Sequence, residues 1–283
     1  MGFEIIEQFV EGKRDDRPCE DLIVATNDFV AVIDGASDET GVEFAGKAGG
    51  RFAAEAVADA VTRLPRHTDA RGFADELTTA LRSNVLDVAG TMDARVRWPA
   101  ASVICCSGSR REVWRVGDCN LLIDGHSFPG HKRVDDAAYG FRAAVNAAAL
   151  AKGASPAEIV EHDPGARAAR PLFDAQQHLA NVVGPWGYGC INGRPVPDEY
   201  VEVYPVPVGS TVIMTTDGFP TVHRTLAESE DELAGLVERD PPAIAEMWSM
   251  GKPAKPGANA PDDRAYIRFT LDERAVTRAD EIR

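Results

Sequence analysis

The sequence predicts an α+β protein in which the strands pair antiparallel. Three observations lead to this prediction. The first 35 residues consist of short apolar segments separated by turn residues, as in strands joined by tight turns. Residues 42–63 and 72–91 then repeat apolar side chains every three or four positions, as amphipathic helices do. Strand-like segments return between residues 101 and 123.

The N-terminal part centres on residues 29–33, a run of five apolar residues that suits a strand buried on both faces. Further strands are predicted at residues 3–10 and 22–25. Asp34 and Gly35 end the central run, and the glycine gives the backbone the freedom that a sharp turn needs. Taken alone, this carboxylate fits an ordinary hairpin turn better than a metal ligand.

The second half of the chain contains both strands and helices. The strands up to residue 123 are expected to form a meander, and Asp163-Pro164-Gly165 is expected to stop a helix that begins at Ser155. Without an internal repeat or a linker, residues 1–283 are predicted to form one domain, with a variable flap or insertion at about 126–200. Strands are predicted at 101–106, 112–116, 120–123, 201–206, 209–216 and 265–271, and helices at 135–152 and 228–250.

The composition argues against several classes of partner. The net charge is −15, from 45 acidic and 30 basic residues, which suits neither nucleic acid nor an anionic membrane surface. The sequence shows no signal-peptide pattern and no apolar run of about 18 residues that would span a membrane. The five cysteines form no CxxC pair, so we expect neither zinc nor a disulfide framework, and a cytoplasmic location.

Acidic residues stand at the ends of strands throughout the chain. Carboxylates are the protein ligands that Mg²⁺ and Mn²⁺ prefer. If antiparallel neighbours bring these strand ends to one edge, the acids would surround divalent ions. The alternative is that they are turn residues spread over the surface of an acidic protein. The positions are Glu20-Asp21, Asp34-Gly35, Gly117-Asp118, Asp217-Gly218 and Asp262-Asp263.

In their order, these motifs resemble the metal-dependent serine/threonine phosphatases of the protein phosphatase 2C family. Each motif alone is degenerate, but together they span nearly the whole chain. The segments that carry the resemblance are Cys19-Glu20-Asp21, residues 30–35 (Val-Ala-Val-Ile-Asp-Gly), 114–118 (Trp-Arg-Val-Gly-Asp), 213–218 (Ile-Met-Thr-Thr-Asp-Gly) and 262–267 (Asp-Asp-Arg-Ala-Tyr-Ile).

The resemblance implies a four-layer α/β/β/α sandwich of two antiparallel sheets flanked by helices. It also implies two Mn²⁺ or Mg²⁺ ions, with Asp34 bridging them and the Gly35 carbonyl completing one coordination shell. Glu20 would bind one ion directly or through water, and Asp21 would act through the water shell.

The resemblance also assigns roles to the remaining acids. Asp217 and Asp262 would hold the other ion. Asp262 is chosen over Asp263 because the first acid of this pair is the ligand in the family. Asp118, together with Asp217, would form a looser third metal site.

Several motifs depart from the family pattern. Ala36-Ser37-Asp38 stands where the family often has His or Met and two glycines, so a general acid is absent there. The family's phosphate-binding arginine lies a few residues before Glu-Asp, and Arg17 is the candidate, with Arg14 as the alternative. Cys119-Asn120 replaces the family's Ser-Arg, and the 126–200 region is unlike its variable flap.

The activity implied by the resemblance is hydrolysis of phosphoserine and phosphothreonine esters. A water activated by two metal ions would attack phosphorus, and Arg17 would stabilise the developing charge. The partner would be a phosphorylated protein or, because the motifs after Asp34 and in the flap differ, a small phosphorylated substrate. A catalytically silent binding module that keeps the phosphatase fold is the alternative of another class.

Overall fold

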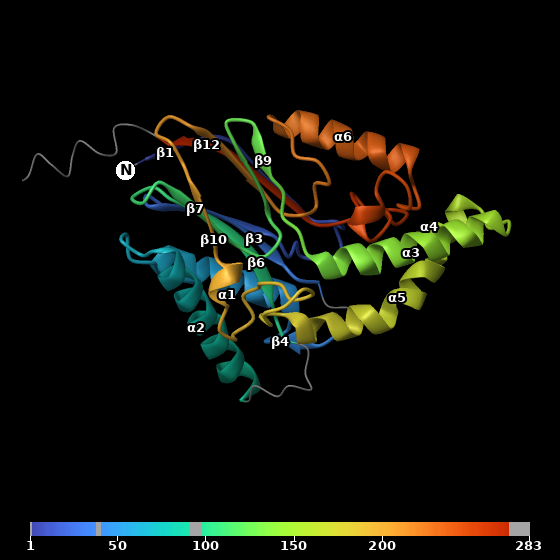
Figure 1. Ribbon diagram of the computed structural model, residues 1–283, viewed down its shortest axis with the longest axis horizontal. Coiled ribbons are helices and arrows are strands. Elements are labelled where there is room, and N and C mark those ends of the chain that lie inside the picture. The colour runs from blue at the N-terminus through green and yellow to red at the C-terminus, as the bar shows by residue number, and fades with distance from the viewer. Residues whose placement is uncertain (1, 38–40, 91–97, 272–283) are drawn as a thin grey trace, which may run out of the picture.

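A computed structural model describes residues 2–37, 41–90 and 98–271 of the chain. In this part, two five-stranded antiparallel sheets lie face to face, and helices lie on their outer faces (Figure 1). The predicted α+β class and the four-layer α/β/β/α arrangement are therefore confirmed. Asp38, the last residue of the altered motif after Gly35, lies outside the described residues.

The first sheet has the strand order β10-β7-β6-β3-β2. Two of its three inner strands, β3 and β6, are buried along almost their whole length, as expected for apolar runs covered on both faces. The strands are β2 (Leu22–Ala25), β3 (Phe29–Gly35), β6 (Ala101–Ser107), β7 (Glu112–Val116) and β10 (Glu202–Pro205).

The second sheet has the strand order β1-β12-β11-β8-β9. β8 and β9 form a hairpin whose turn residues, Asp124 and Gly125, both have positive φ (50° and 82°). Asp124 is thus the plain turn residue that its position between two short strands suggests. The strands are β1 (Phe3–Glu11), β8 (Asn120–Ile123), β9 (His126–Phe128), β11 (Thr211–Thr215) and β12 (Arg264–Leu271).

Three helices cover the sheets. α1 (Gly49–Arg63) and α2 (Ala70–Ala89) pack on the first sheet, and α6 (Leu226–Arg239) lies over the second (Figure 1). The remaining helices extend beyond one end of the sandwich (Figure 1). They are α3 (Arg133–Ala151), α4 (Pro156–His162) and α5 (Pro164–Ala175). In the described part of the chain, no helix is both long and apolar enough to cross a membrane.

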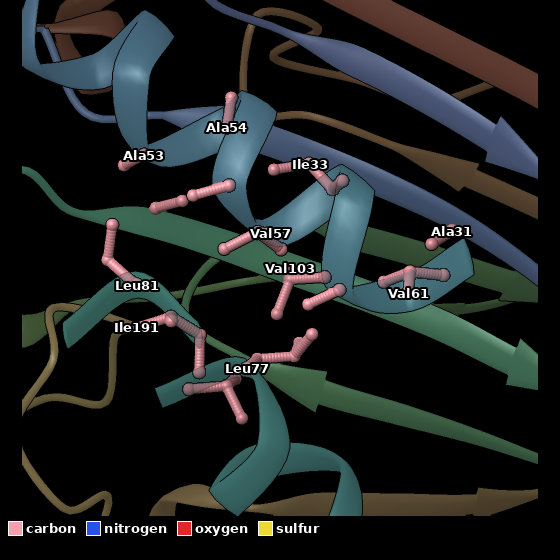
Figure 2. Close-up of a cluster of buried hydrophobic side chains, with 14 of the residues drawn as sticks. Ala31, Ile33, Ala53, Ala54, Val57, Val61, Leu77, Leu81, Val103 and Ile191 are labelled. Carbon is pink, nitrogen blue, oxygen red and sulfur yellow. The ribbon is translucent and has the colours of Figure 1, made fainter. Parts of the chain in front are cut away.

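Two apolar layers hold the sandwich together. Val32 and Met214 belong to the layer between the two sheets. Ile33, the next residue along β3, lies instead in the layer beneath α1 and α2, with Val57 and Leu77 (Figure 2). This alternation follows from the two-residue period of a strand. Burial of each such side chain contributes about 1.5–3 kcal/mol.

The first helix begins later than predicted. The sequence predicts a helix from residue 42, but α1 begins at Gly49. The six residues before it form a hairpin, β4 (Glu43–Phe44) with β5 (Lys47–Ala48), whose two turn residues have positive φ (50° and 74°). Periodicity alone misses this break because Phe44 still packs on the helix, with its ring 5.5 Å from that of Phe52.

Two strands lie in a different sheet from their neighbours in the sequence. The first three strands are expected to pair with one another, but β1 pairs with β12. The predicted meander over residues 101–123 is wrong at its third strand, because β8 pairs with β11 in the second sheet. Gly117, at φ 106°, turns the chain between the sheets. Local periodicity defines a strand but not its partner.

Asp163 ends one helix and begins the next. The predicted stop after Ser155 is confirmed, because α4 ends at His162. However, Pro164 is the first residue of α5, a helix that the sequence pattern does not predict. A proline is tolerated there because its missing N–H would have no helical partner.

The helix predicted over residues 228–250 is also shorter. α6 ends at Arg239, and Pro241-Pro242 follow. The Asp240 carboxylate accepts hydrogen bonds from three backbone N–H groups in residues 244–247, which folds the chain into a compact turn. Only Trp248–Met250 forms a further helical turn, of the 3₁₀ type.

Candidate active site

Strand ends from both sheets meet at a cavity of about 200 Å³. Asp34 lies at the end of β3, and Asp217 follows β11. Asp21 directly precedes β2, and Asp262 lies two residues before β12. All four carboxylates line this cavity, so the structure brings together acids that are far apart in the sequence.

Close backbone packing fixes the position of Asp34. A Cβ on Gly35 would lie 2.5 Å from the Gly50 carbonyl oxygen and 2.7 Å from that of Glu20. Likewise, a Cβ on Gly50 would lie 2.7 Å from the Ala36 carbonyl oxygen. Only glycines allow the end of β3, the start of α1 and the segment before β2 to approach this closely. Gly50 thus costs helix propensity but lets α1 begin against the site.

Asp21, Asp34 and Asp217, which we call the inner carboxylates, have few hydrogen-bond or ion-pair partners. Among the described residues, Asp34 and Asp217 have no side-chain hydrogen bond or ion pair, and Asp21 Oδ2 is buried without a hydrogen bond. Burial raises the pKa of each carboxyl group, and the neighbouring carboxylates raise it further. For Asp217 the pKa is raised to about 7. Lys132 lowers the pKa of Asp34 and of Asp217, and Lys252 lowers that of Asp217, but burial and the neighbouring carboxylates outweigh these lysines.

Glu20 and Asp262, the outer carboxylates, are paired with lysines. Lys13 Nζ lies 3.2 Å from Asp262 Oδ1 and 3.6 Å from Glu20 Oε2. Lys252 pairs with the other oxygen of Asp262. Although burial raises the pKa of Asp262, the two lysines outweigh it and hold that pKa below its usual value.

Asp263 has a structural position. Its Oδ1 accepts a hydrogen bond from the Lys13 backbone N–H (2.7 Å), and its Oδ2 accepts one from that of Glu20 (3.0 Å). Both oxygens therefore hold the loop between β1 and β2 against the start of β12. The choice of Asp262 over Asp263 as a ligand stays a prediction, and these contacts favour it.

Asp118 lies behind the cavity rather than on its wall. It is buried, accepts a hydrogen bond from Ser102 Oγ (2.5 Å) and pairs with Lys132 Nζ (2.6 Å). Burial opposes its ionisation, but Lys132 and Ser102 outweigh this and lower its pKa. Lys132 itself lines the cavity, whereas Asp118 does not.

The arginines predicted to bind phosphate are not brought to the cavity. Arg17 is exposed and is not part of the lining, and Arg14 pairs with Asp16 at 2.6 Å. Among the described residues, Arg194 is the arginine that lines the cavity. Its guanidinium carbon lies 5.6 Å from the centre of the Trp98 ring, and its side chain makes no hydrogen bond or ion pair with a described residue.

The sequence does not predict that four cationic side chains lie at this site. They come from separate loops, and no spacing rule marks them, because a lysine side chain reaches acids far away in the sequence. The sequence of residues 126–200 also predicts no role in a site, yet these residues supply one wall of the cavity. The cations are Lys13, Lys132, Lys252 and Arg194, and the wall includes Tyr139, Gln176, His178 and Tyr188.

The chemistry of the inner carboxylates fits a hard divalent cation. As the side chains stand, no three His, Cys, Asp or Glu residues in the described ranges are arranged to hold a metal ion. However, the inner carboxylates offer free oxygens, including the buried Asp21 Oδ2, and carboxylate oxygens suit Mg²⁺ and Mn²⁺. The outer carboxylates fit less well because lysines already neutralise them.

Comparison with known proteins gives similarity at the level of structure. No protein-family model and no curated protein matches the sequence. Among solved structures, the Mycobacterium tuberculosis serine/threonine phosphatase PstP/Ppp is 14% identical over 94% of this chain and 98% of that chain, with a TM-score of 0.48. The PstP catalytic domain in complex with two manganese ions is 13% identical over 95% and 99% of the two chains, with a TM-score of 0.49.

A further similar structure is Stp1 from Staphylococcus aureus. It is 14% identical over 95% of each chain, with a TM-score of 0.49. These three structures are of serine/threonine phosphatases. At this identity the likeness concerns the fold alone.

Proposed function

We propose that this chain is a divalent-metal-dependent hydrolase of phosphate monoesters. The observation that supports the proposal is the inner carboxylate group: Asp21, Asp34 and Asp217 line one cavity without hydrogen-bond or ion-pair partners for most of their oxygens. Carboxylates withdrawn from water are costly unless they are paired with positive charge. A purely structural role does not account for them, whereas binding of a cation does.

The residues around the cavity have distinct proposed roles. Asp21, Asp34 and Asp217 would hold the ion, together with the Gly35 carbonyl of the predicted ligand set. The ion would supply positive charge against the phosphoryl oxygens and lower the pKa of nearby water. Lys132 and Arg194, which line the same cavity, would bind and orient the phosphoryl group.

The proposed substrate class is phosphoserine or phosphothreonine in a protein, as the sequence resemblance implies. A small phosphorylated metabolite is the alternative, because the 126–200 segment forms part of the cavity wall. A cytoplasmic location is part of the proposal and is supported by the five free cysteines.

Phosphate release tests the proposal. The purified full chain is given p-nitrophenyl phosphate, a phosphothreonine peptide and a set of sugar phosphates, first with Mn²⁺ and then with excess chelator. We expect release that requires Mn²⁺, and the ratio of kcat/KM values between peptide and sugar phosphates identifies the substrate class. Absence of Mn²⁺-dependent release from every substrate would contradict the proposal.

The pairing of the outer carboxylates with lysines favours a second candidate, a catalytically silent binding module. In such a module, Lys13 and Lys252 would replace metal charge and keep the phosphatase fold intact. This candidate predicts no hydrolysis with any divalent ion, so the same assay separates the two functions.

A further inference from the structure

The side chain of Lys13 lies among three carboxylates. Its Nζ is 3.2 Å from Asp262, and 3.6 Å from both Glu20 and Asp263. It also donates a hydrogen bond to Ser37 Oγ (2.7 Å), which in turn donates to Glu20 Oε2 (2.5 Å). One ammonium group thus occupies the space between the outer carboxylates in which these acids would have to coordinate a second metal ion.

Lys252 completes the neutralisation of Asp262. Asp262 Oδ1 accepts hydrogen bonds from Lys13 Nζ (3.2 Å) and from the Asp263 backbone N–H (2.9 Å). Lys252 pairs with Asp262 Oδ2. Both oxygens of this predicted ligand are therefore committed to other groups, in contrast to the oxygens of Asp34.

The backbone holds both lysines in place. The Lys13 N–H donates to Asp263 Oδ1 (2.7 Å), and the Lys13 carbonyl accepts from the Asn259 N–H (3.0 Å). Lys252 follows Gly251, which has φ 69° and where a Cβ would lie 2.3 Å from the Tyr139 ring. The main chain of Lys13 is thus fixed beside the acids that its side chain contacts, and Lys252 directly follows a glycine that packs closely on Tyr139.

We infer that Lys13 and Lys252 take the place of one metal ion, so that the chain binds a single divalent ion at Asp21, Asp34 and Asp217. The inference rests on the proposed function, since it concerns the same site. A second ion at Asp262 would have to break two ion pairs and lie beside two ammonium groups. Lys132 has the same effect at Asp118, where it neutralises the acid predicted for a third ion.

The stoichiometry of Mn²⁺ binding tests this inference. The full chain is stripped with chelator, exchanged into chelator-free buffer and titrated with Mn²⁺ by calorimetry, and its electron paramagnetic resonance spectrum is recorded. We expect one ion per wild-type chain and the six-line spectrum of isolated Mn²⁺. The double variant Lys13→Met/Lys252→Met is expected to bind a second ion at least tenfold more tightly than the wild type does. It should also show the broadened spectrum of neighbouring ions.

The matched control is Lys152→Met, which removes an exposed lysine just after α3 and should leave the stoichiometry at one. Two tightly bound ions in the wild type would overturn the inference while leaving the proposed function intact. No bound ion in the wild type would overturn both. A folded double variant that still binds one ion would show that the lysines do not exclude the second.

If circular dichroism shows that the double variant is unfolded, two other measurements still test whether the lysines replace a metal ion. The wild-type stoichiometry alone overturns the inference if it is two. The single variant Lys252→Met frees one oxygen of Asp262 and is expected to strengthen binding of the second ion at least threefold, and an unchanged affinity counts against the inference.

Discussion

Asp163 and Asp34 both lie at the end of a secondary-structure element, Asp163 buried and Asp34 half-buried, but only Asp163 has hydrogen-bond partners for its carboxylate. Its carboxylate accepts hydrogen bonds from Arg142 Nε (2.9 Å), Asn146 Nδ2 (2.8 Å) and the Ala166 backbone N–H (2.9 Å). The Asp34 carboxylate accepts none from the described residues, and the neighbouring carboxylates of Asp217 and Asp21 raise its pKa beyond the effect of burial.

The difference separates a structural acid from one that we propose binds a ligand. Arg142, which is fully buried, also donates to the carbonyls of Ala243 (2.7 Å) and Pro242 (3.0 Å), so the Asp163 network ties α3 to the segment after α6. A fully paired buried network stabilises one packing arrangement. The unpaired oxygens of Asp34 lower stability and are available to a ligand.

Replacement of Asp34 should have the largest effect on activity. Asp34→Asn removes one charged oxygen ligand without changing the side-chain size, so we expect kcat/KM with p-nitrophenyl phosphate and Mn²⁺ to fall by about 10³-fold. The variant should remain folded by circular dichroism. Asp59→Asn, at an exposed position on α1, is the control and should keep its activity. A wild-type rate in Asp34→Asn would show that this carboxylate is only a turn residue.

Replacement of Asp163 should instead lower stability. Asp163→Asn leaves the buried Arg142 guanidinium without its counter-charge, and removal of one partner of a buried pair costs about 3–5 kcal/mol. Urea denaturation measures this loss in the free energy of unfolding. Asp174→Asn breaks an exposed pair with Arg170 (2.8 Å) and should cost less than about 0.5 kcal/mol. Equal losses in the two variants would refute the contrast between the sites.

The inner carboxylates should make the metal-free chain less stable as the pH rises. Their folded-state pKa values lie above the usual value of 3.8, so the native state binds more protons than the unfolded state between about pH 4 and pH 7. Stability is then highest near the lower end of this range and falls as the pH rises towards the pKa of about 7 of Asp217.

Urea denaturation in chelator at pH 5 and pH 7.5 checks the sign, with an expected loss of about 1–3 kcal/mol. Saturating Mn²⁺ should remove most of the difference, because the ion compensates the ionised carboxylates. Asp262 does not contribute in this range, since its pKa is lowered and it stays ionised. A metal-free chain that becomes more stable over this range would contradict the proposed excess of negative charge among the inner carboxylates.

Part of the candidate site can be predicted from the sequence alone, and part of it cannot. Each acid that lines the cavity at a strand end is visible locally, because Asp34, Asp217 and Asp262 border strands with a clear apolar pattern. Strand partners are not visible, since β1 pairs with a strand more than 250 residues away. The cations are not visible either, because a charged loop looks solvated until the fold shows which acid Lys13 contacts.

The contrast between Arg17 and Arg194 leads to the last prediction. Arg17 has the sequence position of a phosphate ligand but is exposed, whereas Arg194 lines the cavity beside Trp98. The Asn181 side chain holds the Arg194 segment by donating to the carbonyls of Cys190 (2.9 Å) and Arg194 (3.4 Å). The guanidinium therefore projects from a fixed backbone.

We expect Arg194→Ala to raise KM for p-nitrophenyl phosphate about tenfold, equivalent to about 1.4 kcal/mol of lost binding, while Arg17→Ala changes it less than twofold. Because a guanidinium binds two phosphate oxygens at once and an ammonium binds as a point charge, Arg194→Lys should recover only part of the loss. Weakened inhibition by inorganic phosphate in Arg194→Ala would show that the change lies in phosphate binding. If Arg17→Ala alone raised KM, the loop before Glu20 would have to move to the cavity when substrate binds.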